Sequence, residues 1–283
     1  MKLRCRDSLI SLDQTVVMGV LNVTPDSFSD GGLWFDADAA VAHAVDMVHG
    51  GAGIVDVGGE STRPGAHAVD EHEETTRVIP VIERLVREID VPVSIDTRKA
   101  AVARRAVDAG ASIINNTSGE DGDARLDDVA VETRAAVIVM HSRGTPTTMQ
   151  SLAHYSDVVN EVRDFLKART GDLELRGVPR DAVVVDPGFG FAKTSDHNLL
   201  LLRRLDELTT LGYPVLVGTS RKAFIGSVLD LPSGERLEGT AATVAWAVAK
   251  GARIVRAHDV KAMARVVRVT EAISDATAAA AYS

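Results

Sequence analysis

The sequence predicts an α/β protein, a (β/α)8 barrel of the TIM type, from three observations. Eight short apolar runs alternate with segments whose apolar residues recur at helical spacing. The runs are continuous in apolar residues, which is typical of strands buried on both faces of a parallel sheet. Each run stops at or near a polar residue, and parallel barrels carry their reacting groups at the carboxyl ends of eight strands.

The expected elements follow one another as strand–helix units. The expected strands are 16–21, 54–57, 93–95, 112–114, 136–140, 182–185, 215–217 and 253–255. The expected helices occupy about 36–49, 71–89, 99–109, 125–133, 156–168, 199–208, 225–231 with 240–249, and 260–273. Repeated alternation of this kind implies parallel pairing through right-handed crossovers.

Local signals justify the helix boundaries. Asp36 is expected to cap the first helix, in which Val41 and Val45 recur at helical spacing before Gly50 ends it. Pro80 lies inside the second expected helix, where it should kink or locally break the helix because it lacks a backbone N–H.

An open, doubly wound sheet is the alternative architecture. Such sheets gather their polar residues at one switch point, whereas here polar residues follow every expected strand. No linker rich in Pro, Gly or Ser interrupts the 283 residues, and an eight-fold barrel typically needs about 250. We therefore expect one domain over 1–283, with its core at about 16–273.

Composition and charge narrow the class of function. The net charge is −9 and no Lys/Arg cluster stands out, which argues against nucleic-acid binding. Cys5 is the only cysteine, so no intrachain disulfide can form. No apolar run approaches the roughly 18 residues needed to span a bilayer, and the amino terminus does not read as a secretion signal. We expect a cytoplasmic enzyme that acts on small molecules without a membrane partner.

Five loop sequences follow expected strands in the order of the chain. They are NVTPDSFSDGG at 22–32, GGESTRPGA at 58–66, DPGFGFAKT at 186–194, GTSRKAFIG at 218–226 and RAHD at 256–259. Together they resemble the dihydropteroate synthase family, and the resemblance runs from about Val16 to Ile273. It implies a (β/α)8 transferase that forms a C–N bond and is a target of sulfonamides. The implied reaction joins 6-hydroxymethyl-7,8-dihydropterin diphosphate to p-aminobenzoate and yields 7,8-dihydropteroate and diphosphate.

The polar residues at several strand ends suit the chemistry of a pterin. Asp186 can accept two donors side by side from the guanidine-like edge of the ring. Asn115 can donate and accept at once, and Asp96 offers another acceptor. The resemblance implies these three as pterin ligands, with Lys222 as a charged donor and Phe189 as part of the wall. The alternatives are that Asp96 caps a helix and that Phe189 anchors its loop.

A leaving diphosphate needs cationic and hydrogen-bond donors, because charge develops on its bridging oxygen as the bond breaks. The resemblance implies Thr62, Arg63, Arg256 and His258 for this role. It also implies Asn22 as a ligand for Mg²⁺, an ion that favours oxygen ligands beside substrate phosphates. Without the resemblance, Asn22 would be interpreted as a helix-entry or turn residue, and His258 could be an ordinary buried histidine. The expected catalytic residues are Arg63, Lys222, Arg256 and His258.

The second substrate is a neutral nucleophile near pH 7, so the chemistry requires no strong general base. The family's SN1-like path loses diphosphate first and leaves a pterin-stabilised methylene cation, which the amine captures; we treat this path as a hypothesis. The residues implied for p-aminobenzoate are Phe28, Pro64, Ser220, Lys222 and Ala223. The alternative for Phe28 and Pro64 is that they anchor their loops. We expect the loops at 22–32 and 58–66 to be mobile without substrate.

Four positions have no settled role. Ala223 stands where the family often has Ser, which predicts weaker binding of p-aminobenzoate, and Asn116 stands where the family usually has Asp. Arg143 has no role that follows from the sequence, and Asp56, inside an expected strand, suits a structural role nearly as well as a functional one.

Two other functions compete. One is a pterin-binding barrel that transfers methyl groups from methyltetrahydrofolate, which would not need the diphosphate residues. The other is a catalytically weak paralogue that only binds pterins. A homodimer is implied by the resemblance.

Overall fold

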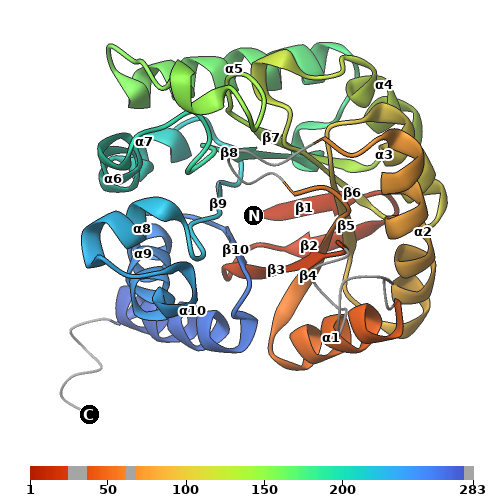
Figure 1. The fold of residues 1–283 in the computed structure, drawn as a ribbon, viewed down its shortest axis with the longest axis horizontal. Coiled ribbons are helices and arrows are strands. Elements are labelled where there is room, and N and C mark those ends of the chain that lie inside the picture. The colour runs from red at the N-terminus through yellow and green to blue at the C-terminus, as the bar shows by residue number, and fades with distance from the viewer. Residues whose placement is uncertain (25–36, 62–67, 277–283) are drawn as a thin grey trace.

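The structure is a computed structural model that describes residues 1–24, 37–61 and 68–276. Eight parallel strands form a nearly closed barrel (Figure 1). They are β3 Val16–Asn22, β4 Ala52–Gly58, β5 Val93–Thr97, β6 Ile113–Asn116, β7 Ala136–Met140, β8 Val183–Asp186, β9 Leu216–Val217 and β10 Ile254–Ala257. Their order is β8-β7-β6-β5-β4-β3-β10-β9, and a parallel bridge between Val185 and Val215 joins the two ends. The predicted (β/α)8 class is confirmed.

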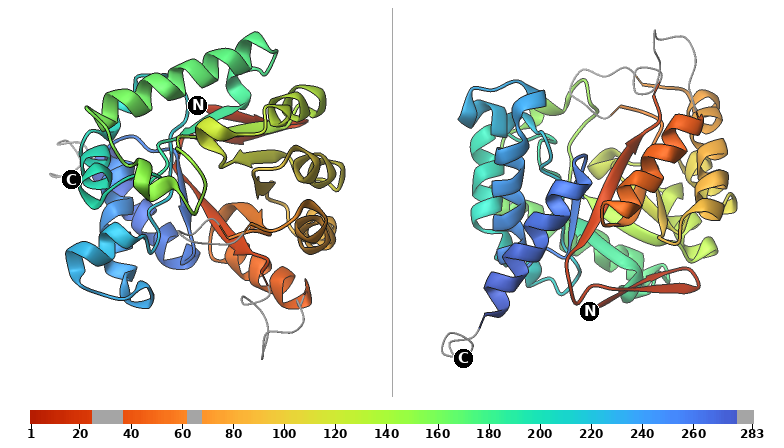
Figure 2. Two further views of the ribbon diagram at one scale, coloured as in Figure 1. Left: turned by 45° about the horizontal axis from the view of Figure 1, so that its top comes forward. Right: turned by 90° about the horizontal axis from the view of Figure 1, so that it is seen from below.

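Helices follow the strands and surround the barrel (Figure 2). They are α1 Ala37–His49, α2 Glu71–Glu88, α3 Ala100–Asp108, α4 Arg125–Thr133, α5 Val158–Leu175, α6 Ser195–Arg203, α7 Leu205–Thr209, α8 Ala223–Leu229, α9 Leu237–Ala249 and α10 Val260–Asp275. Short 3₁₀ turns lie at Gly119–Asp121, Met149–Leu152, Arg180–Ala182 and Ser233–Glu235.

Some local expectations need correction. Helix α2 runs without interruption through Pro80, because the residues on either side, such as Val78 and Val81, are held in the core. Tertiary packing of this kind outweighs the loss of one backbone hydrogen bond. The segment before the first barrel strand, read as a short lead-in, is an antiparallel hairpin of β1 Lys2–Cys5 and β2 Ser8–Ser11.

Two hydrophobic clusters divide the core. The larger lies between the strands and the helices, and alternate strand residues such as Val17 point into it. The smaller one lies inside the barrel at the amino ends of the strands and includes Met18 and Ile254. Leu3, Cys5 and Leu12 of the hairpin segment complete this inner cluster.

The hairpin therefore plugs one end of the barrel. Burial raises the pKa of the Cys5 thiol to about 12, so this cysteine stays protonated and acts as a small apolar residue. Because the amino end is filled by packed side chains, a functional site inside the barrel is confined to the carboxyl end, as is usual for this fold.

We predict that truncation of the plug destabilises the protein. Leu12 is 0% exposed, so Leu12→Ala should lower the free energy of unfolding by about 2–5 kcal/mol. Leu9, on the same hairpin, is 54% exposed, and Leu9→Ala should change it by less than about 0.5 kcal/mol. Urea unfolding followed by circular dichroism measures both values. Equal effects of the two substitutions would contradict the plug.

Candidate functional site

The carboxyl ends of the strands bring together side chains that lie far apart in the sequence. Arg256 on β10 is the central group: its Nε donates to Asp56 Oδ2 at 2.7 Å, and its Nη2 donates to Asp96 Oδ2 at 2.7 Å. Asn115 Nδ2 also donates to Asp56 Oδ2, at 3.0 Å. Thr117 Oγ1 donates to Asp96 Oδ1 at 3.0 Å. The mouth of the barrel thus holds one network of two carboxylates, one guanidinium and two neutral donors.

Lys222 and Asp186 belong to the same electrostatic environment. Burial, helped by the charge of Arg256, lowers the pKa of Lys222 to about 8, although Asp186 and Asp96 oppose the shift. Burial also raises the pKa of Asp186. The backbone N–H of Gly188, which donates to Asp186 Oδ1 at 2.7 Å, opposes this shift by stabilising the carboxylate. Since these groups influence one another, they face one region.

Asp96 is a buried carboxylate with a raised pKa. Burial, helped by the charge of Asp56, raises the pKa of Asp96 to about 7, although the charge of Arg256 opposes the rise. Burial opposes the charge of Arg256, yet Asp56 and Asp96 raise its pKa and keep the guanidinium protonated. The two acids therefore compete for one cation in a buried setting.

Two buried acceptors in this network lack a donor within the described residues: Asp56 Oδ1 and Asn115 Oδ1. A buried acceptor without a donor is costly. A ligand with several N–H groups would satisfy such atoms, and so would water. The mouth is thus suited to a donor-rich heterocycle.

The loop after β8 carries two phenylalanines, and the sequence predicted a role only for Phe189. Phe189 is 1% exposed and lies in the core between strands and helices, with its ring centroid 6.5 Å from that of Phe224. This placement favours the loop-anchor alternative over a pterin wall. Phe191, which sequence reasoning missed, carries Lys222 Nζ 4.3 Å from its ring centroid, a cation–π geometry.

The loops after β9 and β10 are joined by side-chain bonds. Ser220 Oγ lies 3.0 Å from His258 Nδ1 and accepts from the backbone N–H of His258 at 3.2 Å. Arg221, in the left-handed region at φ 58°, donates through Nε to Asp259 at 3.0 Å. Ala223 is the first residue of α8, directly after Lys222. Ser220, His258 and Lys222 are therefore brought to one side of the mouth.

The remaining expected residues divide into two groups. Asn22 is the last residue of β3, level with Gly58 of β4, and so it lies at the mouth. Phe28, Thr62, Arg63 and Pro64 lie outside the described residues, as do most of the two loops expected to be mobile. Their predicted roles stay predictions.

Two unexplained positions have structural partners. Asn116 Oδ1 accepts from the backbone N–H of Ser118 at 3.1 Å and also from the Ser118 hydroxyl, so it organises the turn after β6. Arg143 donates to Glu120 at 3.2 Å, to Glu161 at 3.1 Å and to the carbonyl of His154 at 2.9 Å. Neither needs a ligand to account for its presence.

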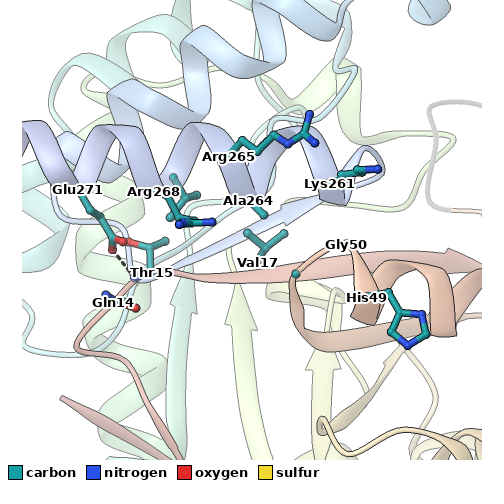
Figure 3. Close-up of a pocket in the computed structure, with 12 residues that line it drawn as sticks. Gln14, Thr15, Val17, His49, Gly50, Lys261, Ala264, Arg265, Arg268 and Glu271 are labelled. Atoms are coloured by element: carbon teal, nitrogen blue, oxygen red, sulfur yellow. Dashed lines mark hydrogen bonds between the residues drawn. The ribbon is translucent and has the colours of Figure 1, made fainter.

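A separate hollow of about 380 Å³ lies on the flank of the barrel, between α10 and the turn after α1 (Figure 3). Lys261, Arg265 and Arg268 line one side of it. The Glu271 carboxylate accepts from the backbone N–H of Thr15 at 2.5 Å. None of the strand-end residues of the mouth line this hollow, so it is not the site predicted from the sequence.

Comparisons with known proteins agree with this geometry. A family model described as "Pterin binding enzyme" matches residues 18–258. The dihydropteroate synthase of Synechocystis is 50% identical over 261 residues, covering 92% of this chain and 90% of that protein. The chain belongs to the dihydropteroate synthase family. The methyltransferase and pterin-binding-paralogue alternatives receive no support from these relatives.

Solved dihydropteroate synthase structures share the whole fold. That of Yersinia pestis, in a sulfonamide drug complex, superposes with a TM-score of 0.92 at 40% identity and covers 98% of this chain and 100% of its own. That of Xanthomonas albilineans, in complex with 7,8-dihydropteroate, gives a TM-score of 0.88 at 39% identity, with 98% and 100% covered. The activity expected for this dihydropteroate synthase family member is thus that of a transferase forming a C–N bond.

Two further observations concern membrane spans and metal-binding clusters in the described part of the chain. Within residues 1–24, 37–61 and 68–276, no helix is both long and apolar enough to cross a membrane. In that same part of the chain, no group of three or more His, Cys, Asp or Glu side chains is arranged to hold a metal.

The raised pKa of Asp96 predicts a pH-dependent stability difference. Between about pH 4 and 7 the folded state binds more protons at Asp96 than the unfolded state, so this group's contribution falls as the pH rises. Asn does not titrate. The stability of the wild type relative to Asp96→Asn should therefore increase as the pH falls from 7 to 4, by at most about 1.4 kcal/mol per pH unit.

A carboxylate with the opposite shift is the control, measured in the same urea titrations. A hydrogen bond from Arg125 lowers the pKa of Asp123, so the wild type should lose its advantage over Asp123→Asn as the pH falls below about 4. A pH-independent difference for Asp96→Asn would show that its carboxyl is not shifted.

Proposed function

We propose that this chain condenses 6-hydroxymethyl-7,8-dihydropterin diphosphate with p-aminobenzoate, giving 7,8-dihydropteroate and diphosphate. The observation that carries the proposal is the Arg256 network, in which a cation and two carboxylates from three strands meet beside Asn115, Asp186 and Lys222. Such a mouth offers acceptors for the amino edge of a pterin and a cation for a departing phosphate.

The pterin would lie against the acidic side of the mouth. Asp186 keeps one oxygen on Gly188 N–H and can turn the other toward the ring. Asn115 and Asp96 supply further polar groups, and Lys222 donates from the opposite side. Asp56, whose role the sequence left open, joins the set because it orients both Asn115 and Arg256.

Arg256 would serve the diphosphate. In the structure its guanidinium is held by Asp56 and Asp96, with Nε and Nη2 engaged. The guanidinium has further N–H donors, which can reach a phosphate oxygen while the carboxylates fix its plane. His258 joins it from the same strand end, and we place Thr62 and Arg63 here by resemblance.

The second substrate would bind on the side of the mouth formed by the loops after β9 and β10. Ser220, Lys222 and Ala223 supply a hydroxyl, an ammonium and the first backbone N–H of α8, all suited to a carboxylate. Phe28 and Pro64 are assigned to the ring by resemblance. Ala223 offers no side-chain donor, which is the basis for expecting weaker p-aminobenzoate binding.

The bond changes follow from these positions. The C–O bond between the pterin methylene and the diphosphate breaks, and the electron pair leaves with the diphosphate, whose charge the cationic groups stabilise. The lone pair of the arylamine then forms the C–N bond, and the amine loses a proton to water. No strong base is needed because the amine is neutral at the start.

Mg²⁺ fits this site through Asn22. Asn22 ends β3 at the mouth, and an amide oxygen is a ligand of the kind that this ion prefers. The described part of the chain contains no cluster of three or more carboxylate, histidine or cysteine side chains that could hold a metal ion. Most ligands of a bound Mg²⁺ would therefore be phosphate oxygens and water. When bound, the ion would neutralise charge on the diphosphate. We also propose a cytoplasmic location. We further propose a homodimer, which a molar mass from light scattering would test.

A turnover assay tests the proposed function. Purified protein with the pterin diphosphate, p-aminobenzoate and Mg²⁺ should release diphosphate and form dihydropteroate in equal amounts, and EDTA should stop both. Asn22→Ala should raise the Mg²⁺ concentration for half-maximal rate by about tenfold or more. Absence of product from folded protein would refute the assignment, and full activity in EDTA would refute the metal.

The lowered pKa of Lys222 predicts an alkaline limit to activity. Above about pH 8 the side chain loses its proton and can no longer act as a charged donor, so kcat/KM for the pterin diphosphate should fall about tenfold per pH unit. Lys222→Met should lower kcat/KM at pH 7 by about 10- to 100-fold and remove this limb. Lys167→Met, at an exposed position on α5, should change neither kcat/KM at pH 7 nor the alkaline fall in activity. An alkaline limb retained in Lys222→Met would assign it to another group.

A further inference from the structure

Lys193 is a buried cation that the proposed chemistry does not use. It is 3% exposed, and its Nζ lies 2.9 Å from His141 Nδ1, 3.0 Å from the Phe191 carbonyl and 3.4 Å from the His141 carbonyl. An ammonium group has three N–H donors, so these three acceptors match it in number. Within the described residues no carboxylate forms an ion pair with it. Its contacts are instead directed at two backbone segments.

One of those segments is the loop of residues 187–192, which has an unusual backbone. Gly188 and Gly190 have positive φ angles of 70° and 80°, and Ala192 has a φ of 48°, which a residue with a Cβ rarely adopts. A Cβ on Gly188 would lie 1.9 Å from the His141 carbonyl oxygen. The loop is therefore pressed against the end of β7 in a conformation that needs support from its surroundings.

Side chains supply that support on both sides of Lys193. The Tyr155 hydroxyl donates to the Ala192 carbonyl at 3.0 Å, and Asn198 Oδ1 accepts from the Gly190 N–H at 2.7 Å. Lys193 binds the carbonyl of Phe191, which lies between these two points. Lys193 also hydrogen-bonds to His141, the residue directly after β7, and so fastens the loop to the end of that strand.

The same loop forms a wall for Lys222. The Phe191 ring lies beneath Lys222 Nζ, 4.3 Å from it. At Gly190 a Cβ would meet Lys222 Cδ at 3.1 Å and Nζ at 3.5 Å, so the bare backbone packs directly on the Lys222 side chain. The position of this loop thus decides where the Lys222 ammonium lies.

We propose that Lys193 is a positioning residue for Lys222, acting through the loop 187–192 that it fastens to the end of β7. The proposal rests on the proposed function, because Lys222 is taken there to bind the pterin. Lys193 itself touches no substrate. Without its three hydrogen bonds the loop can leave the strained conformation, and Phe191 and Gly190 no longer hold Lys222 toward Asp186.

Lys193→Met tests the proposal, since methionine fills a similar volume without donors. Titration calorimetry with the pterin diphosphate and Mg²⁺, without p-aminobenzoate, should show at least tenfold weaker binding. In turnover, KM for the pterin diphosphate should rise by a similar factor, whereas KM for p-aminobenzoate should change less than threefold. Lys250→Met is the matched control: this half-buried lysine pairs with Asp206, and its loss should leave pterin diphosphate binding and both KM values unchanged.

A second variant decides the matter if Lys193→Met does not fold. Tyr155→Phe removes the adjacent bond to the loop but keeps the ring, and it should weaken pterin diphosphate binding two- to fivefold. If Lys193→Met folds and binds the pterin diphosphate within twofold of the wild type, the proposal is overturned. If only Tyr155→Phe folds, unchanged binding of the pterin diphosphate by that variant overturns it. Failure of the wild type to turn over would instead refute the proposed function.

Discussion

The structure depends on one buried arrangement, the Arg256 guanidinium shared by Asp56 and Asp96. It joins β10 to β4 and β5 across the mouth of the barrel, and burial makes each of the three charges costly without the others. Removing Arg256 would leave two buried carboxylates without their cation. The arrangement therefore prepares the site and constrains it: the cation is kept protonated, oriented and close to the place where negative charge would develop.

The barrel separates stability from chemistry along its axis. At the amino end, the hairpin and residues such as Met18 and Ile254 form a dry cluster in which even Cys5 is inert. At the carboxyl end, polar groups remain with unsatisfied acceptors that a ligand can use. Packing at one end can hold the strands in register while the other end retains groups that would be unfavourable in a purely structural core.

Loops that contribute to the mouth are held by side-chain hydrogen bonds where the structure describes them. The segment after β8 combines positive φ angles with side-chain bonds to its carbonyls and amides, and the loops after β9 and β10 are joined through Ser220 and His258. These loops bury the Lys222 side chain, and burial is the main reason that its pKa falls to about 8. A lysine so placed can change its charge near physiological pH.

The sequence alone determined the barrel and the identity of its strand-end residues. Continuous apolar runs that alternate with helical segments predict parallel buried strands, and the polar residue after each run marks the carboxyl end of that strand. It predicted Asp96, Asn115, Asp186, Lys222 and Arg256 at one mouth. Only the tertiary structure decided which of them contact each other. Asp56 and Thr117 joined the network, Phe191 lay beside Lys222 while Phe189 packed in the core, and the hairpin filled the amino end of the barrel, because these depend on contacts between distant segments that no local pattern encodes.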